Sequence, residues 1–328
     1  MIYADQRWIG DHGIGRFARH VLGGIKYRAI SLDGHPAAAF DSYRLWRAIR
    51  DLKDDDLFFS PGYNSPLVCR SRFIFTIHDL SHVYCPENSS PLIQLYYATI
   101  LKRACKQAQA ILTVSEFTRS QILEWSGVDA GRVLNVGCGV DPAYHPEGES
   151  CRCSFPYILC VSNRKPHKNE FRIVEAFARS AGAPAVKLVF TGNSTSQLAA
   201  CISKHGLTQD VIFTGQVAES KLPSLYRGAV ALLFPSLYEG FGLPIVEAMA
   251  CGTPVITSNV TAMPEVAGGA ALLVEPTSTI EIAAAIQTVI EDASLRARLR
   301  AKGVARATTF SWMKIVDAVR ETLAFYSA

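Results

Sequence analysis

Two glutamates, Glu239 and Glu247, lie eight positions apart around a glycine-rich turn. The apolar run Ala229–Phe234 before them is typical of a buried parallel strand, so Glu239 should follow the carboxyl end of that strand. Pro244 suits the first turn of a helix that would carry Glu247. Carboxylates accept hydrogen bonds from hydroxyl groups, whereas backbone amides of Gly240–Gly242 and a helix N-terminus attract phosphate. The segment therefore predicts a ligand that carries both hydroxyls and phosphate, such as a sugar nucleotide.

A basic loop follows another expected strand, Tyr157–Val161, and leads into a helix that starts near Asn169. The loop contains Arg164, Lys165 and Lys168. Fixed cations at the carboxyl end of a strand suit a leaving diphosphate, whose growing negative charge they would stabilise. Either Arg164 or Lys165 could accompany Lys168 at the phosphate, and the sequence leaves that choice open.

The composition indicates a well-packed α/β protein with reduced thiols. The chain has 328 residues, 49% of them hydrophobic, and a net charge of only +4, which is too small to predict nucleic acid binding. Its nine cysteines are odd in number and scattered, and the Cys151–Cys153 spacing is wrong for a zinc knuckle. The chain start lacks the pattern of a signal peptide, and no apolar run could span a bilayer. We therefore expect a cytoplasmic protein.

Short β-branched runs alternate with helical segments along the whole chain, which predicts α/β domains with parallel sheets. The expected strands are Met1–Asp5, Tyr27–Leu32, Leu57–Ser60, Arg72–Ile77, Ala110–Val114, Arg132–Val136, Tyr157–Val161, Lys187–Phe190, Val211–Phe213, Ala229–Phe234, Pro254–Thr257 and Ala271–Val274. Periodicity stops over Asp141–Ser150, where proline, glycine and charge collect. We expect two doubly wound domains, 1–150 and 151–309.

The segment from Tyr238 to Val255, YEGFGLPIVEAMACGTPV, resembles the Glu-x7-Glu motif of the retaining GT-B glycosyltransferases of family 4, also called group 1. The resemblance implies the GT-B fold, with two Rossmann-like domains facing a central cleft. It also implies that the last segment, 310–328, is a helix crossing back to the N-terminal domain, which would hold the acceptor. The implied activity is transfer of a hexose from a nucleoside diphosphate sugar to a hydroxyl group with retention of configuration. No metal or other cofactor is expected, because cations would stabilise the diphosphate.

The resemblance also implies a role for each site residue. The catalytic residues would be His78, at the end of the strand Arg72–Ile77, and Glu239. The donor diphosphate would be bound by Gly13, Gly15, Arg164 and Lys168. The base and ribose would be bound by Gly215, Gln216, Val217 and Glu247. The donor sugar would be bound by Glu239, Gly240, Phe241, Gly242 and Leu243. The arginine that many family members carry in the basic loop falls at Asn163, so this chain departs from the common pattern there.

A further resemblance bears on the donor and the acceptor. The His78-Asp-Leu and Asn163-Arg-Lys-Pro-His-Lys-Asn segments are similar in style to those of bacterial polysaccharide mannosyltransferases, which favours GDP-mannose. The expected acceptor is a glycan or lipid-linked glycan in cell-surface polysaccharide synthesis, such as lipopolysaccharide. Such an acceptor would bring the protein to the inner face of the cell membrane as a peripheral protein.

Several alternatives fit parts of the pattern. A transferase of the same fold could use a UDP-linked sugar, and a GT-B epimerase or a non-catalytic sensor could use the same phosphate site. Gly13-x-Gly15-x-x-Ala18, with Asp33 further on, also fits the fingerprint of an NAD-dependent oxidoreductase. The residues directly before these glycines are polar rather than an apolar strand, and a dinucleotide site leaves Glu239 and Glu247 unexplained.

Overall fold

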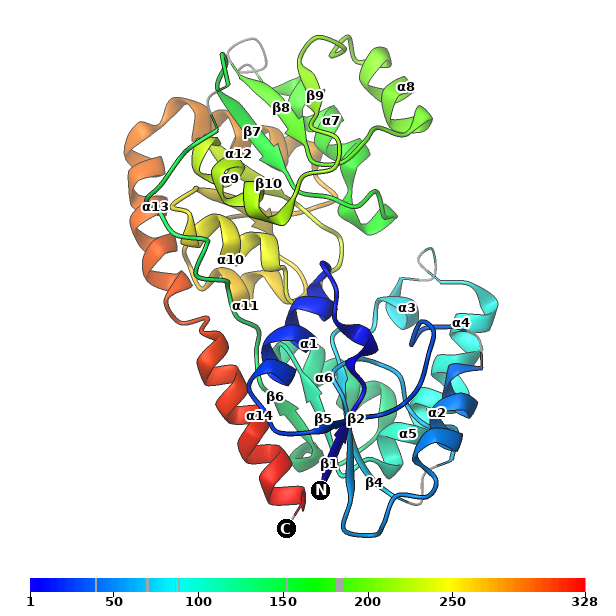
Figure 1. Ribbon diagram of the computed structural model, residues 1–328. Coiled ribbons are helices and arrows are strands. Elements are labelled where there is room, and N and C mark those ends of the chain that lie inside the picture. The colour runs from blue at the N-terminus through cyan, green and yellow to red at the C-terminus, as the bar shows by residue number, and fades with distance from the viewer. Residues whose placement is uncertain are drawn as a thin grey trace. The chain divides into compact units, whose positions relative to one another are not determined.

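The computed structural model describes residues 1–38, 40–68, 71–85, 87, 89–151, 153–180 and 186–327. The chain divides into two compact units (Figure 1). One unit combines Met1–Gly139 with Ser311–Ala328, and the other is Val140–Phe310. No described helix is long and apolar enough to span a membrane.

The first unit contains a six-stranded parallel sheet in the order β2-β1-β3-β4-β5-β6. Its strands are β1 (Ile2–Ala4), β2 (Arg28–Ala29), β3 (Leu57–Ser60), β4 (Arg72–Ile77), β5 (Ala110–Thr113) and β6 (Val133–Asn135). Its helices are α1 (Gly13–Gly23), α2 (Asp41–Ile49), α3 (Ser81–Tyr84), α4 (Pro91–Tyr96), α5 (Lys102–Gln107), α6 (Glu116–Ser126) and α14 (Trp312–Ser327).

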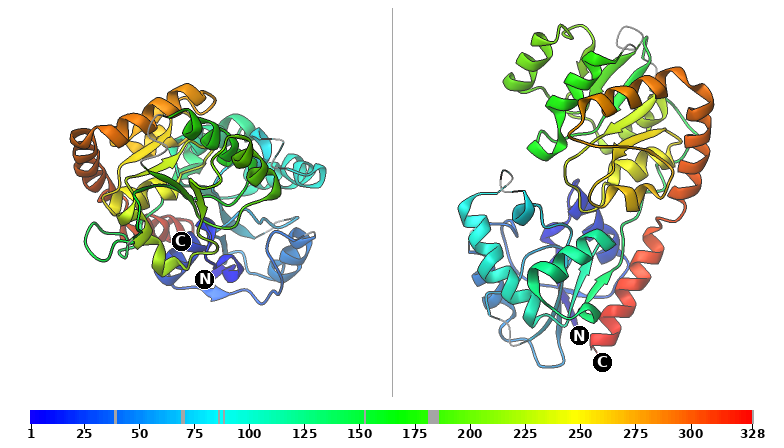
Figure 2. Two further views of the ribbon diagram at one scale, coloured as in Figure 1. Left: turned by 90° about the horizontal axis from the view of Figure 1, so that it is seen from above. Right: turned by 180° about the vertical axis from the view of Figure 1, so that it is seen from behind.

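Helices cover both faces of this first sheet. Side chains from α2, α5 and α6 pack with Phe58, Phe73, Phe75 and Ile111 in one buried cluster. On the other face, α14 packs on α1 and reaches β3, and Figure 2 shows this red C-terminal helix lying along the unit. Its Trp312 ring stacks on His20 at 4.3 Å between ring centroids. The last helix is therefore part of the unit that contains the chain start.

The second unit contains a second six-stranded parallel sheet, in the order β12-β11-β10-β7-β8-β9. Its strands are β7 (Tyr157–Cys160), β8 (Lys187–Phe190), β9 (Val211–Phe213), β10 (Ala231–Phe234), β11 (Val255–Ser258) and β12 (Leu272–Val274). Its helices are α7 (Glu170–Arg179), α8 (Ser196–Lys204), α9 (Leu222–Gly228), α10 (Leu243–Ala250), α11 (Met263–Ala267), α12 (Thr279–Glu291) and α13 (Ala293–Ala307).

Successive side chains of each strand in the second sheet point to opposite faces, so the sheet has one buried core on each face. Ile158, Leu188, Leu233 and Ile256 point to the face covered by α7, α8 and α12. On the opposite face α10 packs on β10 and β11, and α13 packs on α10. Both sheets are thus doubly wound, as the alternating sequence predicts.

The structure places the division between the units at 139/140, whereas the sequence suggested a boundary at residue 150. The polar segment 141–150 packs on the second unit. The ring of Tyr144 lies edge-on to Tyr226 with centroids 5.9 Å apart, and the Arg227 guanidinium donates to the backbone oxygen of Glu149 at 2.9 Å. Loss of periodicity marked an irregular segment correctly, but it could not show which unit holds that segment.

Candidate functional site

The second sheet reverses its strand order between β7 and β10. These strands are adjacent and parallel, with Leu159 opposite Leu232, while β8 and β11 continue outward on either side. Ligands of doubly wound sheets bind at such a switch point, outside the carboxyl ends of the strands. The loops that leave β7 and β10 are the two that carry Lys168 and Glu239.

Lys168 and Glu239 form an ion pair at this point. The ammonium Nζ donates to Oε1 of the carboxylate at 2.6 Å, and each side chain is only 13% exposed. The amide of Leu237 donates to the carbonyl of His167 at 2.8 Å, which ties the two loops together beside the pair. The ammonium also lies 4.8 Å from the centre of the Phe234 ring. The structure therefore brings together two predicted site residues that are 71 positions apart in the sequence.

Glu247 occupies a more enclosed position inside α10. Its side chain is 1% exposed, and the hydroxyl of Tyr226 in α9 donates to its Oε2 at 2.7 Å. A buried carboxylate is costly unless it accepts hydrogen bonds, so Tyr226 is part of what holds this group in place. The sequence singled out Glu247 and missed Tyr226, because a tyrosine in an ordinary amphipathic helix gives no signal of its partner.

The glycine turn between the two glutamates starts α10. Gly242 has φ +96, a left-handed conformation that favours glycine, and it precedes the first helical residue, Leu243. Pro244 lies in the first turn, as expected. Phe241 is 8% exposed and packs edge-on against Phe310 at 5.6 Å. Its side chain therefore belongs to the packing of the unit, and a role of this turn at the donor sugar stays a prediction.

Arg164 is held by groups different from those that hold Lys168. Its guanidinium pairs with Glu170, and it donates to the backbone oxygens of Thr191 and Asn193, the latter at 2.7 Å. The group also lies 5.4 Å and 5.2 Å from the ring centres of Phe190 and Phe213. These contacts fix the ends of β8 and β9, so a phosphate would compete with Glu170 for this arginine.

The other candidate for the same role, Lys165, is exposed at the start of the 3-10 turn Pro166–Lys168. The role of either residue at a phosphate stays a prediction.

The segment expected to hold the base follows β9. Gly215 has φ +67, and its carbonyl accepts from the amide of Gly192 at 2.8 Å. Gln216 is exposed and Val217 is partly exposed. The two glycine turns after β8 and β9 are therefore joined through their backbones, which leaves little side-chain bulk there.

In the first unit, Gly13 and Gly15 form the first turn of α1. Nδ1 of His12 accepts from the amide of Gly15 at 3.1 Å and caps the helix. A Cβ on Gly15 would lie 2.4 Å from the carbonyl oxygen of Gly10, so no larger residue fits here without movement. Burial lowers the pKa of His12. The residues between β1 and these glycines include a 3-10 turn, Gln6–Trp8, so the strand does not run directly into the glycines as it does in a dinucleotide fingerprint.

His78 follows β4 and is 9% exposed. Its Nε2 lies 2.9 Å from the carbonyl oxygen of Pro61. Because a carbonyl can only accept, Nε2 carries the proton in the neutral ring and Nδ1 is left as an acceptor. Burial lowers the pKa of His78 to about 4. The ring, flanked by Phe17 at 5.0 Å and Tyr63 at 5.9 Å, is therefore neutral at pH 7.

A buried ionic network beside β1 and β3 was not anticipated. Arg7 pairs with Asp5 at 2.6 Å and with Asp41 at 2.7 Å, and Asn64 donates to Asp5 at 2.6 Å. The same amide accepts from the indole of Trp8 at 2.5 Å. Asp5 directly follows a strand, which is the one sequence signal that could have indicated this cluster.

Two family profiles and several known proteins match the chain. The profile described as "Glycosyl transferases group 1" matches residues 153–306, and "Glycosyltransferase Family 4" matches residues 7–144. O-antigen chain mannosyltransferase B of Escherichia coli is 32% identical to the chain, over 81% of it and 73% of that protein. O-antigen chain mannosyltransferase RfbU of Salmonella typhimurium is 30% identical, over 71% of the chain and 65% of that protein.

Solved structures show the same fold. A sucrose-phosphate synthase from Thermosynechococcus elongatus superposes with a TM-score of 0.80 at 20% identity, covering 98% of both chains. The Anabaena protein HepE, solved in complex with UDP-glucose, superposes with a TM-score of 0.79 at 19% identity, again over 98% of both chains. The two doubly wound units therefore have the architecture of these proteins.

Proposed function

Because the chain belongs to the glycosyltransferases of group 1 and family 4, we propose that it transfers mannose from GDP-mannose to a hydroxyl of a glycan or lipid-linked glycan. The proposed reaction retains the anomeric configuration, and its product is part of a cell-surface polysaccharide. The similarity to two O-antigen mannosyltransferases supports the choice of sugar and of pathway.

The observation that carries this proposal is the Lys168–Glu239 ion pair at the switch point of the second sheet. In the proposed donor complex the diphosphate binds Lys168, and the carboxylate of Glu239 turns to the hydroxyls of the sugar. Negative charge grows on the diphosphate as the glycosidic bond breaks, so a fixed ammonium stabilises the transition state more than the ground state. The amides at the start of α10 add partial positive charge.

Glu247 is proposed to bind the ribose of the nucleotide. Tyr226 occupies Oε2 at 2.7 Å, and the proposal assigns the other carboxylate oxygen to ribose hydroxyls. Both glutamates then act as hydrogen-bond acceptors, not as the acid and base of a hydrolase.

His78 is proposed to touch the transferred sugar as a neutral ring. With a pKa near 4, the imidazole carries no charge at pH 7 and cannot act as a general acid there. Its Nδ1 is suited to accept a hydrogen bond from a sugar hydroxyl.

The proposal includes a reaction without a metal ion, in which Lys168 and backbone amides stabilise the leaving diphosphate. It also includes peripheral contact with a membrane where the acceptor is lipid-linked. The approach of Gly13 and Gly15 to the diphosphate belongs to the same proposal.

A donor screen tests the function directly. The purified protein is incubated with GDP-mannose, UDP-glucose or ADP-glucose and a mixture of lipid-linked and free mannosyl oligosaccharides, with and without EDTA. We expect release of GDP, attachment of mannose with an α linkage in the NMR spectrum, and equal rates with and without EDTA. Turnover of a UDP-sugar alone would overturn the assignment of the donor, and a β linkage would overturn retention. The melting temperature of the protein is also measured with each donor. Failure of all three donors to raise it would overturn the proposal as a whole.

A further inference from the structure

A cavity of about 560 Å³ lies at the amino ends of the strands of the second sheet. Pro156, Val186, Val230 and Pro254 line it, and each directly precedes a strand: β7, β8, β10 and β11 respectively. The proposed donor site lies at the carboxyl ends of the same strands, so the cavity is on the opposite edge of the sheet. It has no part in the function proposed above.

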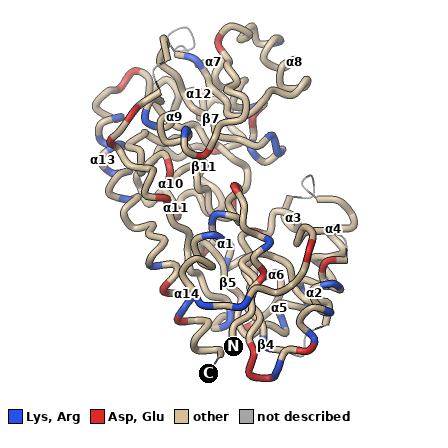
Figure 3. Tube along the Cα trace, in the orientation of Figure 1, with Lys and Arg blue, Asp and Glu red and all other residues tan. Residues whose placement is uncertain are grey.

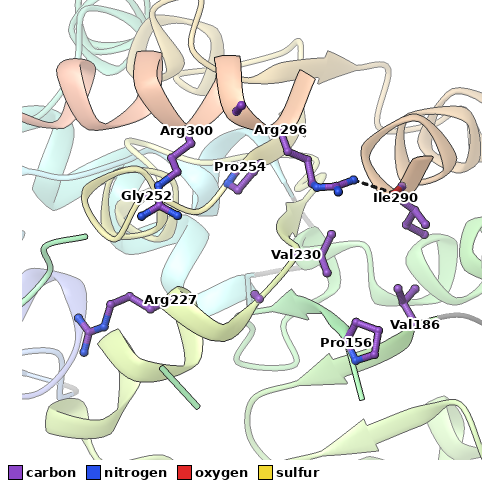
Figure 4. Close-up of a pocket in the computed structure, with 11 residues that line it drawn as sticks. Pro156, Val186, Arg227, Val230, Gly252, Pro254, Ile290, Arg296 and Arg300 are labelled. Atoms are coloured by element: carbon purple, nitrogen blue, oxygen red, sulfur yellow. Dashed lines mark hydrogen bonds between the residues drawn. The ribbon is translucent and has the colours of Figure 1, made fainter. Parts of the chain in front are cut away.

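Three arginines surround this cavity, as Figure 4 shows. Arg227 comes from the end of α9, and Arg296 and Arg300 lie one helical turn apart on α13. The complete lining is Pro156, Val186, Arg227, Ala229, Val230, Gly252, Pro254, Ile290, Arg296, Ala297 and Arg300. Among these described lining residues none is acidic.

The positive charge of the three arginines is not neutralised by a carboxylate within the described parts of the chain. Arg296 donates to the backbone oxygens of Val289 and Ile290, both at 2.7 Å, and thereby closes the end of α12. Arg227 donates to the backbone oxygens of Glu149 at 2.9 Å and His145 at 3.2 Å. Carbonyl partners fix a guanidinium in place and leave its net charge available to an anion.

Arg300 is the most available of the three because it has no hydrogen-bond partner among the described residues. It lies over Gly252, where a Cβ would be 3.1 Å from its Nε. Gly252 has φ +73, so this turn favours glycine for its backbone as well. The side chain of Arg300 therefore lines the cavity, and no hydrogen bond to a described residue holds its guanidinium in place.

We propose that this cavity is a binding site for a small organic phosphate. Guanidinium groups bind phosphate oxygens through paired hydrogen bonds, and the apolar lining of proline, valine and isoleucine suits a hydrocarbon or ring attached to the phosphate. A bare phosphate ion would leave most of the 560 Å³ to water. The ligand is either a free metabolite or the phosphorylated headgroup of a lipid, since both carry this chemistry.

The rest of α13 supplies a matched control. The helix also carries Arg298 and Lys302, both exposed, and Figure 3 shows several basic positions along it. Arg298 lies between Arg296 and Arg300 in sequence but does not line the cavity, and it donates to the hydroxyl of Ser294 at 2.8 Å. Replacing Arg298 removes the same charge from the same helix without touching the proposed site.

The test is calorimetric titration of the full chain with phenyl phosphate and with inorganic phosphate at low salt, where screening is weak. We expect phenyl phosphate to bind more tightly than inorganic phosphate, because only the former contacts the apolar lining. Arg300→Ala is expected to weaken phenyl phosphate binding about tenfold, the loss of one charge-assisted contact. Arg298→Ala and Lys168→Ala are expected to bind as the unaltered chain does.

Three results would overturn the proposal. The first is equal weakening in Arg298→Ala and Arg300→Ala, which would indicate attraction to the helix as a whole. The second is loss of binding in Lys168→Ala, which would place the ligand at the proposed donor site. The third is absence of binding both to phenyl phosphate and, in co-sedimentation, to vesicles containing phosphatidic acid.

The vesicle measurement also identifies the source of the ligand. Vesicle binding that Arg300→Ala abolishes and Arg298→Ala preserves assigns the site to a lipid headgroup. Phenyl phosphate binding without vesicle binding assigns it to a free metabolite.

Discussion

The phenolic hydroxyl of Tyr226 donates to Oε2 of Glu247 at 2.7 Å, and both side chains are almost fully buried. The two residues lie on neighbouring helices, α9 and α10, 21 positions apart. The backbone oxygen of Tyr226 also accepts from the hydroxyl of Thr253 at 2.6 Å, in the turn that follows α10. Tyr226 therefore positions the helix and the carboxylate at once.

Replacing Tyr226 by phenylalanine is expected to weaken donor binding more than it slows transfer. Glu247 would lose a buried hydrogen bond that orients it, at a cost of about 1–3 kcal/mol in stability. We expect KM for the donor to rise about tenfold while kcat changes little. Steady-state kinetics with varied donor and a thermal melt measure both effects.

The matched control for this change is Tyr157→Phe in the same unit. The Tyr157 hydroxyl also donates over 2.7 Å, but to the carbonyl of Leu225 rather than to Glu247. A rise in KM of the same size in this control would show that Tyr226 has no specific role at the donor.

Replacing Lys168 by alanine is expected to weaken donor binding by roughly ten- to hundredfold, the range for hydrogen bonds to charged groups. It also leaves Glu239 without its cation. Fluorescence titration of the variant with the nucleoside diphosphate alone measures the contact with the phosphates separately from contacts with the sugar.

Lys187→Ala is the control, because Lys187 pairs with Asp210 over the same 2.6 Å in the same unit. That pair lies at the start of β8, and each side chain is about a quarter exposed, 27% and 26%. Unchanged affinity for the nucleoside diphosphate in Lys168→Ala would contradict the proposed phosphate site.

The sequence predicted the elements well where period-two or apolar runs are strong. All twelve expected strands overlap strands of the structure, and Leu57–Ser60, Arg72–Ile77 and Lys187–Phe190 agree at both ends. Helical periodicity over Pro91–Ala108 predicts one continuous helix, and here the structure differs. The helix is interrupted by a π-helical stretch at Tyr97–Leu101, and side-chain periodicity does not distinguish a π turn from an α turn over so few residues.

The site was predictable to the extent that its residues lie in local motifs. Lys168 and Glu239 each followed a strand, and strand order then brought them together. The contact between Tyr226 and Glu247 depends on how α9 packs on α10, which no local pattern encodes. The pairing of Arg164 with Glu170 has a different origin, because it depends on the path of the loop after β7, in which Arg164 and Asn169 both have φ +63.

The buried neutral histidine gives a prediction for stability against pH. The pKa of His78 is about 4 in the folded chain and about 6.5 when unfolded. Between these values the unfolded chain binds more protons, so stability falls as the pH drops from about 6.5 to 4 and does not fall further on this account below 4. This difference in pKa corresponds to a loss of about 3 kcal/mol in the free energy of unfolding.

His78→Gln should remove this dependence while keeping a side chain that can donate to the carbonyl of Pro61. Urea denaturation at a series of pH values measures the free energy of unfolding. The slope between pH 4 and 6.5 should be smaller in the variant, whereas equal slopes would mean that His78 is accessible to protons in the fold. His205→Gln, on the second unit, provides a comparison with a histidine at the end of α8.

The two ends of α1 provide the last prediction. Gly15→Ala would place a Cβ 2.4 Å from the carbonyl oxygen of Gly10, so the loop before the helix must move. We expect a loss of about 1–3 kcal/mol in stability, as for other overpacked sites. We also expect weaker donor binding, because the amides of this turn are proposed to approach the diphosphate.

Gly23 lies in the same helix and has open space around its Cβ position. Gly23→Ala should therefore stabilise the helix by up to about 1 kcal/mol and leave donor affinity unchanged. Thermal melts and donor titrations of the two variants separate the effects, and a Gly15→Ala chain as stable as Gly23→Ala would contradict the tight packing of Gly10 on Gly15.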